Sequence, residues 1–476
     1  MPDLIQPSQV AVHVYINGEL LVQDRLGGTN FAGDTTGIYP WRWDTTGLRG
    51  EQTVTVVLDP DDLILAGDET VENNTASYTV DILASGERPF RETATSWLSR
   101  DGRYATVHVL DQTAASRDLS QLVSLTDEAF EEAIGRLGLT PNRLYDVYFI
   151  QRVIGQGGYA GGSIVLTYSD RNYAGGIMRQ VLVHEAVHLL DQQLAPRAIP
   201  FLREGVAVWA AGGHYQPEDL GQRMAALVQA GRYIPLLELV DNFYPAQHEI
   251  GYLQAGGLVH YLVEQYGWEK VQAWYGGMTA EGYTSHSAAL DATLQANFGK
   301  SLAQIEQEWL QHLSQFPSDP QATNDLLATV RYYDMMRRYQ ELHDPTAYFL
   351  NAWLPSPQEM RQRGLTADVL RHPKAEINLL LEVMLGAADA TLLAGDYQQA
   401  NVILNSIERV LESGTVMDPL AKSYEEIVNK TVTMGFEVQR IEMNGNTATA
   451  YITSSHRIYL TPLEFARATN HWVLVN

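Results

Sequence analysis

The sequence predicts a multidomain chain with an N-terminal β-sandwich, a central mostly helical α+β domain, and a C-terminal helical region ending in a small α+β unit. The chain has 476 residues, which suits about three domains. Short alternating apolar segments fill residues 9–83, whereas helical spacing dominates from about 175 to 434. Alternating segments return over residues 435–475.

The N-terminal β-sandwich is assigned to residues 1–85. Residues 10–16 alternate and lead into Asn17-Gly18, a hairpin-turn signal, and residues 52–58 and 76–82 alternate in the same way. Short strands with turn residues between them favour an Ig-like sandwich. The acidic loop from Asp59 to Asp62 leaves calcium binding open, although it lacks the regular spacing of a calcium loop.

About 75 residues of this region resemble the CARDB family of bacterial cell-surface Ig-like modules. The matching stretches are residues 43–48, 57–60, 67–69 and 72–74. The resemblance implies a cell-surface partner for the N-terminal module. A plain β-sandwich spacer without a partner is an equal alternative.

The central domain is assigned to residues 104–316, after a predicted linker over 84–103. Residues 155–162 are rich in glycine but lack the Lys-Ser/Thr of a phosphate loop, so they predict a sharp turn or a backbone surface for a peptide. The expected elements are strands at 104–109, 146–150 and 163–168, and helices at 119–138, 177–194, from 200 onward, at 253–265 and from 301 onward.

The C-terminal region is assigned to residues 321–476, after the breaker cluster Pro317-Ser318-Asp319-Pro320. Helical spacing predicts helices near 322–342, 374–394 and 396–413. Strands follow over 435–475, interrupted by Asn444-Gly445-Asn446. A helix followed by a short antiparallel meander is similar to an NTF2-like unit.

Composition limits the partners. The net charge of −25 disfavours nucleic acid and anionic lipid as partners. The absence of cysteine excludes disulfides, thiolate metal sites and cysteine nucleophiles. No apolar run is long enough to span a membrane, so none is expected to. The first residues lack a signal peptide, so the protein is either cytoplasmic or has lost a leader.

The most informative motif is His184-Glu185-x-x-His188, within an apolar segment. On a helix the two histidines share one face, so both imidazoles can reach one metal ion. Glu185 lies beside them and can act as a base. Glu204 opens a second helix-like segment. Two His and one Glu are the three protein ligands of a catalytic zinc site, which keeps a fourth position for water.

The central domain resembles the gluzincin metallopeptidases, within the peptidase MA-like group, and the match covers about residues 104–315. It rests on the first motif, on Glu204-Gly205-x-Ala207, on residues 252–267 and on residues 298–309. The resemblance implies a zincin-like fold in which His184, His188 and Glu204 bind one Zn²⁺. It implies Glu185 as the general base and points to Tyr252 as the oxyanion donor.

Other residues are weaker candidates. Tyr261 and His260 are alternative oxyanion donors, although burial in a helix explains both. Asp191 is either a residue that orients an imidazole or an ordinary polar residue at a helix end. Some gluzincins carry an Asp at the position of Val208, so one imidazole is left without its expected partner.

Three polar residues near these motifs have plainer interpretations. His214 is interpreted as a cap or loop residue. His248 is read as a loop residue that could line the cleft. Arg203 is expected in a salt bridge, with a substrate carboxylate as the alternative.

The functional hypothesis is a zinc-dependent hydrolase of peptide bonds that acts on peptides or proteins outside the cytoplasm, at the cell surface or secreted by bacteria. The strand at 163–168 is expected to be either the edge to which substrate adds or an ordinary buried strand. The first rival is a cell-surface adhesion or binding protein with a vestigial metal site. The second is a cytoplasmic regulator that uses the metal domain as a scaffold.

Overall fold

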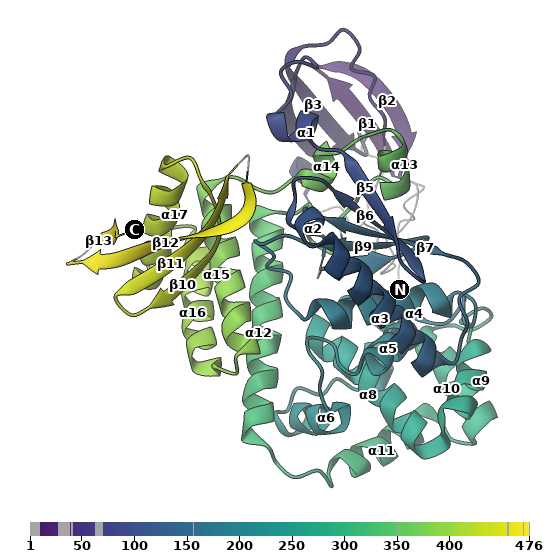
Figure 1. The fold of residues 1–476 in the computed structure, drawn as a ribbon. Helices are drawn as coiled ribbons and strands as arrows, with labels where there is room; N and C mark the ends of the chain where they lie inside the picture. The colour runs from purple at the N-terminus through teal and green to yellow at the C-terminus, as the bar shows by residue number, and fades with distance from the viewer. Residues whose placement is uncertain are drawn as a thin grey trace. The chain divides into compact units, whose positions relative to one another are not determined.

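The computed structural model describes residues 10–26, 39, 41–61, 70–155, 157–350, 352–454, 457–469 and 471–475. The chain separates into two compact units, Met1–Ala94 and Thr95–Asn476. Figure 1 labels most elements of both units. Each unit is described by itself below.

The described part of the first unit contains one antiparallel sheet of four strands, in the order β2-β1-β3-β4. Asn17 and Gly18 both have positive φ, at 51° and 86°, so the predicted hairpin turn is confirmed. Val12 and Val14 pack in a small apolar cluster on one face. The bounds are β1 Ala11–Ile16, β2 Glu19–Arg25, β3 Gly50–Leu58, η2 Val71–Asn74, β4 Thr75–Ile82 and α1 Phe90–Ala94.

The second sheet of the predicted sandwich is not found among the described residues of this unit, so the Ig-like assignment stays a prediction. Two sequence predictions fall partly outside the described residues. The acidic loop from Asp59 to Asp62 loses its last residue, and the CARDB resemblance loses the stretch at 67–69. The region is therefore described at the level of an N-terminal sheet.

The second unit begins with a five-stranded sheet in the order β5-β6-β7-β9-β8. The three central strands are parallel, and the edge strands β5 and β8 run antiparallel to their neighbours. Both edge strands differ from the predictions: β5 lies in the expected linker, and β8 in the glycine-rich turn. The bounds are β5 Trp97–Asp101, β6 Ala105–Leu110, β7 Tyr145–Ile150, β8 Gly158–Ala160 and β9 Ile164–Thr167.

Strand β9 corresponds to the segment 163–168 that was expected either to form the edge or to be buried. All four of its residues are buried, and β8 pairs with it on the outer side. The edge alternative was therefore wrong. Gly158 permits this pairing, because a Cβ there would lie 2.5 Å from Leu166 Cδ2 and 2.7 Å from the Val165 carbonyl oxygen. The exposed edge belongs to β8.

One face of this sheet is covered by helices of the central region. Val107, Val147 and Phe149 point into a large core that also contains helices α3, α4, α5 and α8. Gly138 ends α3 with a φ of 67°, as its sequence predicts. The bounds are α2 Ala114–Arg117, α3 Leu119–Leu137, α4 Met178–Asp191, α5 Pro200–Ala211, α6 Leu220–Gln229, α7 Leu236–Asp241, α8 His248–Tyr266, α9 Trp268–Gly276, α10 His286–Phe298 and α11 Leu302–Leu313.

The other face of the same sheet is covered by a C-terminal segment. Tyr148, Ile150 and Val165 alternate with the residues above and pack against Met360 and Val369. These two residues belong to helices α13 and α14. Residues after 350 therefore complete the layer structure of the sheet that precedes the metal motif.

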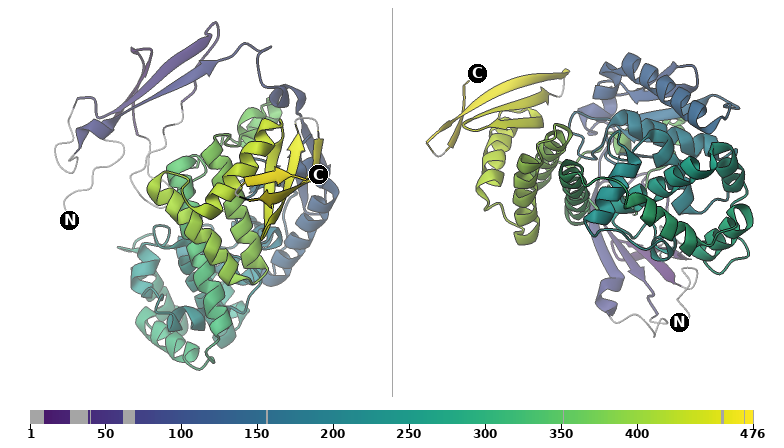
Figure 2. Two further views of the ribbon diagram at one scale, coloured as in Figure 1. Left: turned by 90° about the vertical axis from the view of Figure 1, so that its left-hand side faces the viewer. Right: turned by 90° about the horizontal axis from the view of Figure 1, so that it is seen from below.

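The C-terminal region consists of helices followed by an antiparallel meander in the order β10-β11-β12-β13. Figure 1 shows α12 running between the central helices and α15, and Figure 2 shows α17 against one face of the meander. The bounds are α12 Pro320–His343, α13 Pro357–Gln362, α14 Ala367–Leu370, α15 Glu376–Leu393, α16 Tyr397–Ser413, α17 Pro419–Thr433, β10 Glu437–Asn444, β11 Thr447–Ser454, β12 Arg457–Ala468 and β13 His471–Leu474.

Three predicted C-terminal helices and the meander are confirmed, whereas α17 was not predicted. The NTF2-like comparison stays a prediction. Within the described residues, every helix is too short or too polar to cross a bilayer.

Candidate metal centre

Helix α4 places His184 and His188 one turn apart on one face. The helix is almost entirely buried, because its apolar residues pack against both α3 and α5. The two imidazole rings are 4.8 Å apart between centroids. Burial of the whole helix fixes both side chains toward α5, where the third predicted ligand is located.

Helix α5 brings Glu204 to the two histidines. Pro200 opens the helix, and Gly212 ends it with a φ of 74°, as expected for a proline start and a glycine stop. Glu204 Oε2 lies 3.0 Å from His184 Nε2 and 3.2 Å from His188 Nε2. The two Nε2 atoms are 3.1 Å apart. The sequence therefore predicted three side chains that the fold brings to one point.

These three side chains form a group whose ligand atoms all lie within 4.8 Å of one another. Among the described residues, no second cluster of three or more His, Asp and Glu side chains reaches this proximity. The arrangement is compatible with one metal ion. Donor atoms of the right chemistry converge from two helices, and no cysteine is present to compete.

The charges of the centre are strongly coupled. Burial raises the pKa of Glu204, but the imidazoles of His188 and His184 outweigh burial and hold that pKa well below its usual value. Burial lowers the pKa of His188, but the Glu204 charge outweighs it and raises the pKa to about 9. Burial lowers the pKa of His184 to about 4, against its hydrogen bond to Glu204. The carboxylate is therefore ionised.

Glu185 lies beside this group without joining it. Its side chain is 7% exposed, and no hydrogen bond to it is found among the described residues. Burial raises the pKa of Glu185 to about 7, and the charge of Glu204 adds to this. A buried carboxyl group without a protein partner is free to accept a proton from a bound molecule.

Two tyrosines flank the centre. The Tyr244 hydroxyl donates to Glu204 Oε1 at 3.1 Å, so it orients the oxygen that does not face the imidazoles. Tyr252 lies against His184 with ring centroids 6.0 Å apart, and its hydroxyl has no hydrogen-bond partner among the described residues. Burial raises the pKa of both phenols well above the usual value, so both keep their protons. The sequence indicated Tyr252 but not Tyr244.

His214 and His248 are closer to the centre than their sequence context suggested. The His214 ring lies 6.4 Å from that of His184, and its Nδ1 is 2.6 Å from Glu249 Oε2. His248 is not in a loop but begins α8, and its ring lies 4.3 Å from that of Tyr252. His214 therefore lies in the loop after α5, as its sequence context predicted, whereas the loop placement of His248 was wrong.

Glycines allow α5 and α8 to approach closely. A Cβ on Gly205 would lie 2.6 Å from the Ala255 carbonyl oxygen, and one on Gly256 would lie 2.4 Å from Val208 Cγ1. The Gln254 side chain exchanges two hydrogen bonds with the Ile234 backbone, each 2.8 Å long. Val208 therefore serves helix packing where some gluzincins are expected to carry an Asp.

Several other candidates are not joined to the centre. Asp191 accepts from the Tyr275 hydroxyl at 2.6 Å, and His188 Nδ1 has no partner among the described atoms. His260 pairs with Glu264, and Tyr261 packs on the His312 ring. The salt bridge expected for Arg203 is not found among the described residues, although its charge lowers the pKa of Asp191 against the larger effect of burial.

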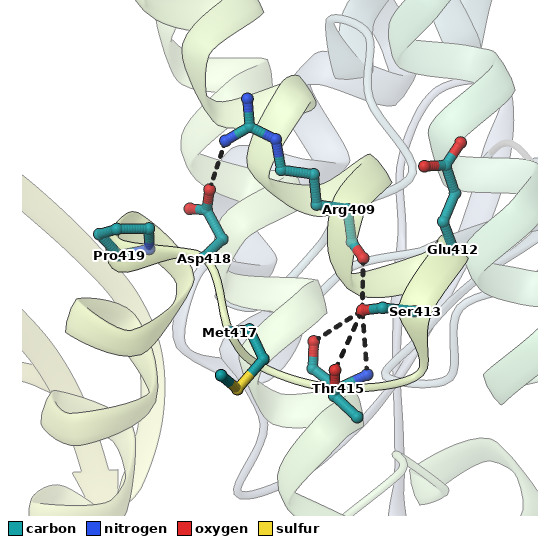
Figure 3. A pocket seen from close by; sticks show the side chains of 7 residues that line it. All are labelled: Arg409, Glu412, Ser413, Thr415, Met417, Asp418 and Pro419. Carbon is teal, nitrogen blue, oxygen red and sulfur yellow. Dashed lines mark hydrogen bonds and ion pairs between the residues drawn. The ribbon is translucent and has the colours of Figure 1, made fainter.

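A separate hollow of about 560 Å³ lies at the turn between α16 and α17 (Figure 3). Its polar groups already bind one another: Arg409 pairs with Asp418 at 2.6 Å, and the Ser413 hydroxyl donates to the backbone. Met417 and Pro419 close the remaining wall. The hollow shares no residue with the metal centre.

Comparison of the chain with family models, with curated proteins and with solved structures finds no match.

Proposed function

We propose that this protein is a zinc-dependent peptidase of the gluzincin type. The observation that carries the proposal is the convergence of His184, His188 and Glu204, whose ligand atoms are 3.0, 3.1 and 3.2 Å apart. Ligands about 2.0–2.1 Å from a tetrahedral zinc ion are about 3.3 Å apart, so the observed triangle needs little adjustment. Two imidazoles and one carboxylate suit zinc, and three protein ligands leave one position free.

The resident metal would polarise the scissile carbonyl and lower the pKa of a water molecule. The remaining roles belong to side chains. Glu185, whose carboxyl group has no protein partner, takes a proton and returns it to the leaving amine. The free Tyr252 hydroxyl donates to the developing oxyanion. Tyr244 is a positioning residue, because it holds Glu204 through the outer oxygen.

The substrate class follows from the exposed edge of the sheet. Within the described part of the chain, β8 pairs with β9 on one side and with no strand on the other, and Tyr159 in its centre is 37% exposed. An extended peptide can add to such an edge through backbone hydrogen bonds that do not depend on its sequence. Helix α4 packs against β8, so a peptide at this edge lies near the metal helix. Extracellular or cell-surface peptides and proteins remain the proposed substrates.

The test uses the full chain and compares the wild type with Glu185→Gln. A control is Glu281→Gln, which removes a Glu at the exposed surface. We expect about one zinc per chain in all three proteins and peptide hydrolysis in the wild type and the control only. Zinc is measured after dialysis and hydrolysis with a degenerate peptide mixture. Zinc without hydrolysis in the wild type would favour the adhesion or binding protein with a vestigial site.

A second variant examines the oxyanion donor. Tyr252→Phe should lower kcat by about 10²–10³ and leave the zinc content unchanged, because it removes one donor to the transition state. An unchanged rate would eliminate Tyr252 from this role while leaving the metal assignment intact.

A further inference from the structure

Arg337 on α12 is a partly buried cation close to the candidate metal centre, and no hydrogen bond or ion pair to it is found among the described residues. Its Nε and Nη2 atoms are shielded from solvent and have no hydrogen-bond partner. Its guanidinium carbon lies 4.0 Å from the centre of the Phe349 ring. Among the described residues, no carboxylate lies within ion-pair distance of it. Its neighbour Asp334 instead accepts from the Gln247 side chain, at 3.1 Å.

The lack of an ion pair stands out because the other two arginines of α12 each lie near a carboxylate. Arg331 and Arg338 on the same helix both lie near Glu408, at 2.7 and 3.7 Å. The chain carries a net charge of −25, so carboxylates are abundant. A shielded guanidinium costs free energy unless an acceptor balances it. An acceptor brought by a ligand would supply that balance.

The surroundings of Arg337 connect it to the proposed active site. His248 is 4% exposed, and both of its ring nitrogens lack a partner. Its ring lies 5.9 Å from that of Phe349 and 4.3 Å from that of Tyr252. The positive charge of Arg337 lowers the pKa of both His248 and Tyr252, although burial has the larger effect on each pKa. Two unpartnered polar side chains therefore adjoin the proposed oxyanion donor.

The geometry points to a carboxylate as the missing ligand. Nε–H and Nη2–H lie on the same edge of a guanidinium, and this edge binds a carboxylate through two parallel hydrogen bonds. We propose that Arg337, with His248 as a second donor, binds the free C-terminal carboxylate of the substrate peptide. This inference rests on the proposed peptidase function, because it assigns the substrate class of the same site.

A consequence is that cleavage takes place near the C-terminus of the substrate. Contacts of 4.0, 5.9 and 4.3 Å connect Arg337 to Tyr252 through the rings of Phe349 and His248. An extended chain spans about 3.3–3.6 Å per residue, so only a few residues fit between the carboxylate and the scissile bond. Phe349 covers the face of the guanidinium, so a carboxylate would bind at the edge formed by Nε and Nη2. Peptides with an amidated C-terminus would lose these hydrogen bonds.

The test uses N-acetylated degenerate hexapeptides, made once as free acids and once as C-terminal amides. Cleavage by the zinc-loaded full chain is followed by mass spectrometry. The variants are Arg337→Gln, Arg337→Lys and two controls. The controls are Arg338→Gln, at the next position, and Arg203→Gln, an arginine next to Glu204 for which no ion pair is found among the described residues. Binding is measured separately, as retention of both mixtures on the immobilised Glu185→Gln protein with and without Arg337→Gln.

We expect the wild type to prefer the free acids by about tenfold to hundredfold, as for a charge-assisted hydrogen bond in a shielded site. Arg337→Gln should abolish the preference, Arg337→Lys should restore part of it, and both controls should keep it. The inference is overturned if the wild type cleaves both mixtures equally. It is also overturned if Arg203→Gln, rather than Arg337→Gln, abolishes the preference for free acids. If the protein cleaved neither mixture but retained the free acids only when Arg337 is present, the peptidase proposal would be refuted and the carboxylate site supported. Equal retention, or none, would overturn that site.

Discussion

One methyl group added at Gly256 should weaken both the fold and the metal centre. A Cβ there would lie 2.4 Å from Val208 Cγ1 and 2.8 Å from Val208 Cβ, whereas carbon atoms in contact are normally about 3.5–4.0 Å apart. Rotation of Val208 does not remove the second contact, and valine in a helix has one strongly preferred rotamer. Helices α5 and α8 must therefore separate by roughly 1 Å.

The separation reaches the metal ligands because the residues share helix faces. Glu204 lies four residues before Val208 on α5, and Tyr252 lies four residues before Gly256 on α8. Overpacking costs about 1–3 kcal/mol, and the better helix propensity of alanine offsets about 1 kcal/mol of this. We expect Gly256→Ala to lower the free energy of unfolding by up to about 2 kcal/mol and the zinc affinity by about tenfold or more.

The assay combines urea unfolding with zinc competition against a chelator. Gly251→Ala on the same helix is the matched control, because its Cβ would meet only ordinary contacts, the nearest at 3.6 Å. It should stabilise the protein by about 0.5–1 kcal/mol. Adding Val208→Ala to Gly256→Ala should restore part of the zinc affinity. If Gly256→Ala matched Gly251→Ala in both measurements, the close-approach argument would be wrong.

Two further predictions concern Tyr244, which donates to Glu204, and Asp389 on α15, a buried carboxyl group that accepts a hydrogen bond from the Tyr215 hydroxyl. Tyr244→Phe removes the donor to Glu204 Oε1, so it should lower the zinc affinity by about 10–100-fold without unfolding the chain. Competition with a chelator measures this affinity. An unchanged zinc affinity would contradict the positioning role of Tyr244. Burial raises the pKa of Asp389 to about 6, so the folded state holds this proton more tightly and its contribution to stability falls as the pH rises from about 4 to about 6. As the pH rises from 4.5 to 7, the free energy of unfolding of Asp389→Asn should therefore increase by about 1–2 kcal/mol relative to that of the wild type. Urea unfolding at both pH values measures this, and a difference between the two proteins that does not change with pH would refute it.

The cluster of His184, His188 and Glu204 was predictable because most of its geometry is local. His184 and His188 need only a helix to share a face, and the apolar context of α4 specified that helix. Pro200 and Gly212 marked the ends of α5, and Ser301 with Gln304 marked the start of α11 through a capping box that the structure contains. Patterns within one helix turn depend little on the rest of the fold.

The missed elements lack such local signals. Four of the five residues of β5 are exposed, so no apolar alternation marks it. Strand β8 has three residues, and it exists because Gly158 allows close pairing with β9. Helix α17 carried signals that were not used, since Asp418 caps it and Pro419 opens it. Tyr244 and Arg337 gave no signal, because they reach the site through contacts distant in sequence.

The residues at and around the cluster come from two parts of the second unit, the central helices and the C-terminal region. The three proposed ligands come from neighbouring helices with a shared core, so their geometry depends on the packing of α4, α5 and α8. On the far side of His248 and Tyr252 from the cluster, the contacting residues are Tyr333 on α12 and Phe349 in the turn after it, both in the C-terminal region. Gly155, before the edge strand, donates its backbone N–H to the Ala347 carbonyl at 2.7 Å. The central helices thus bring the three proposed ligands together, while Tyr333 and Phe349 of the C-terminal region contact His248 beside them.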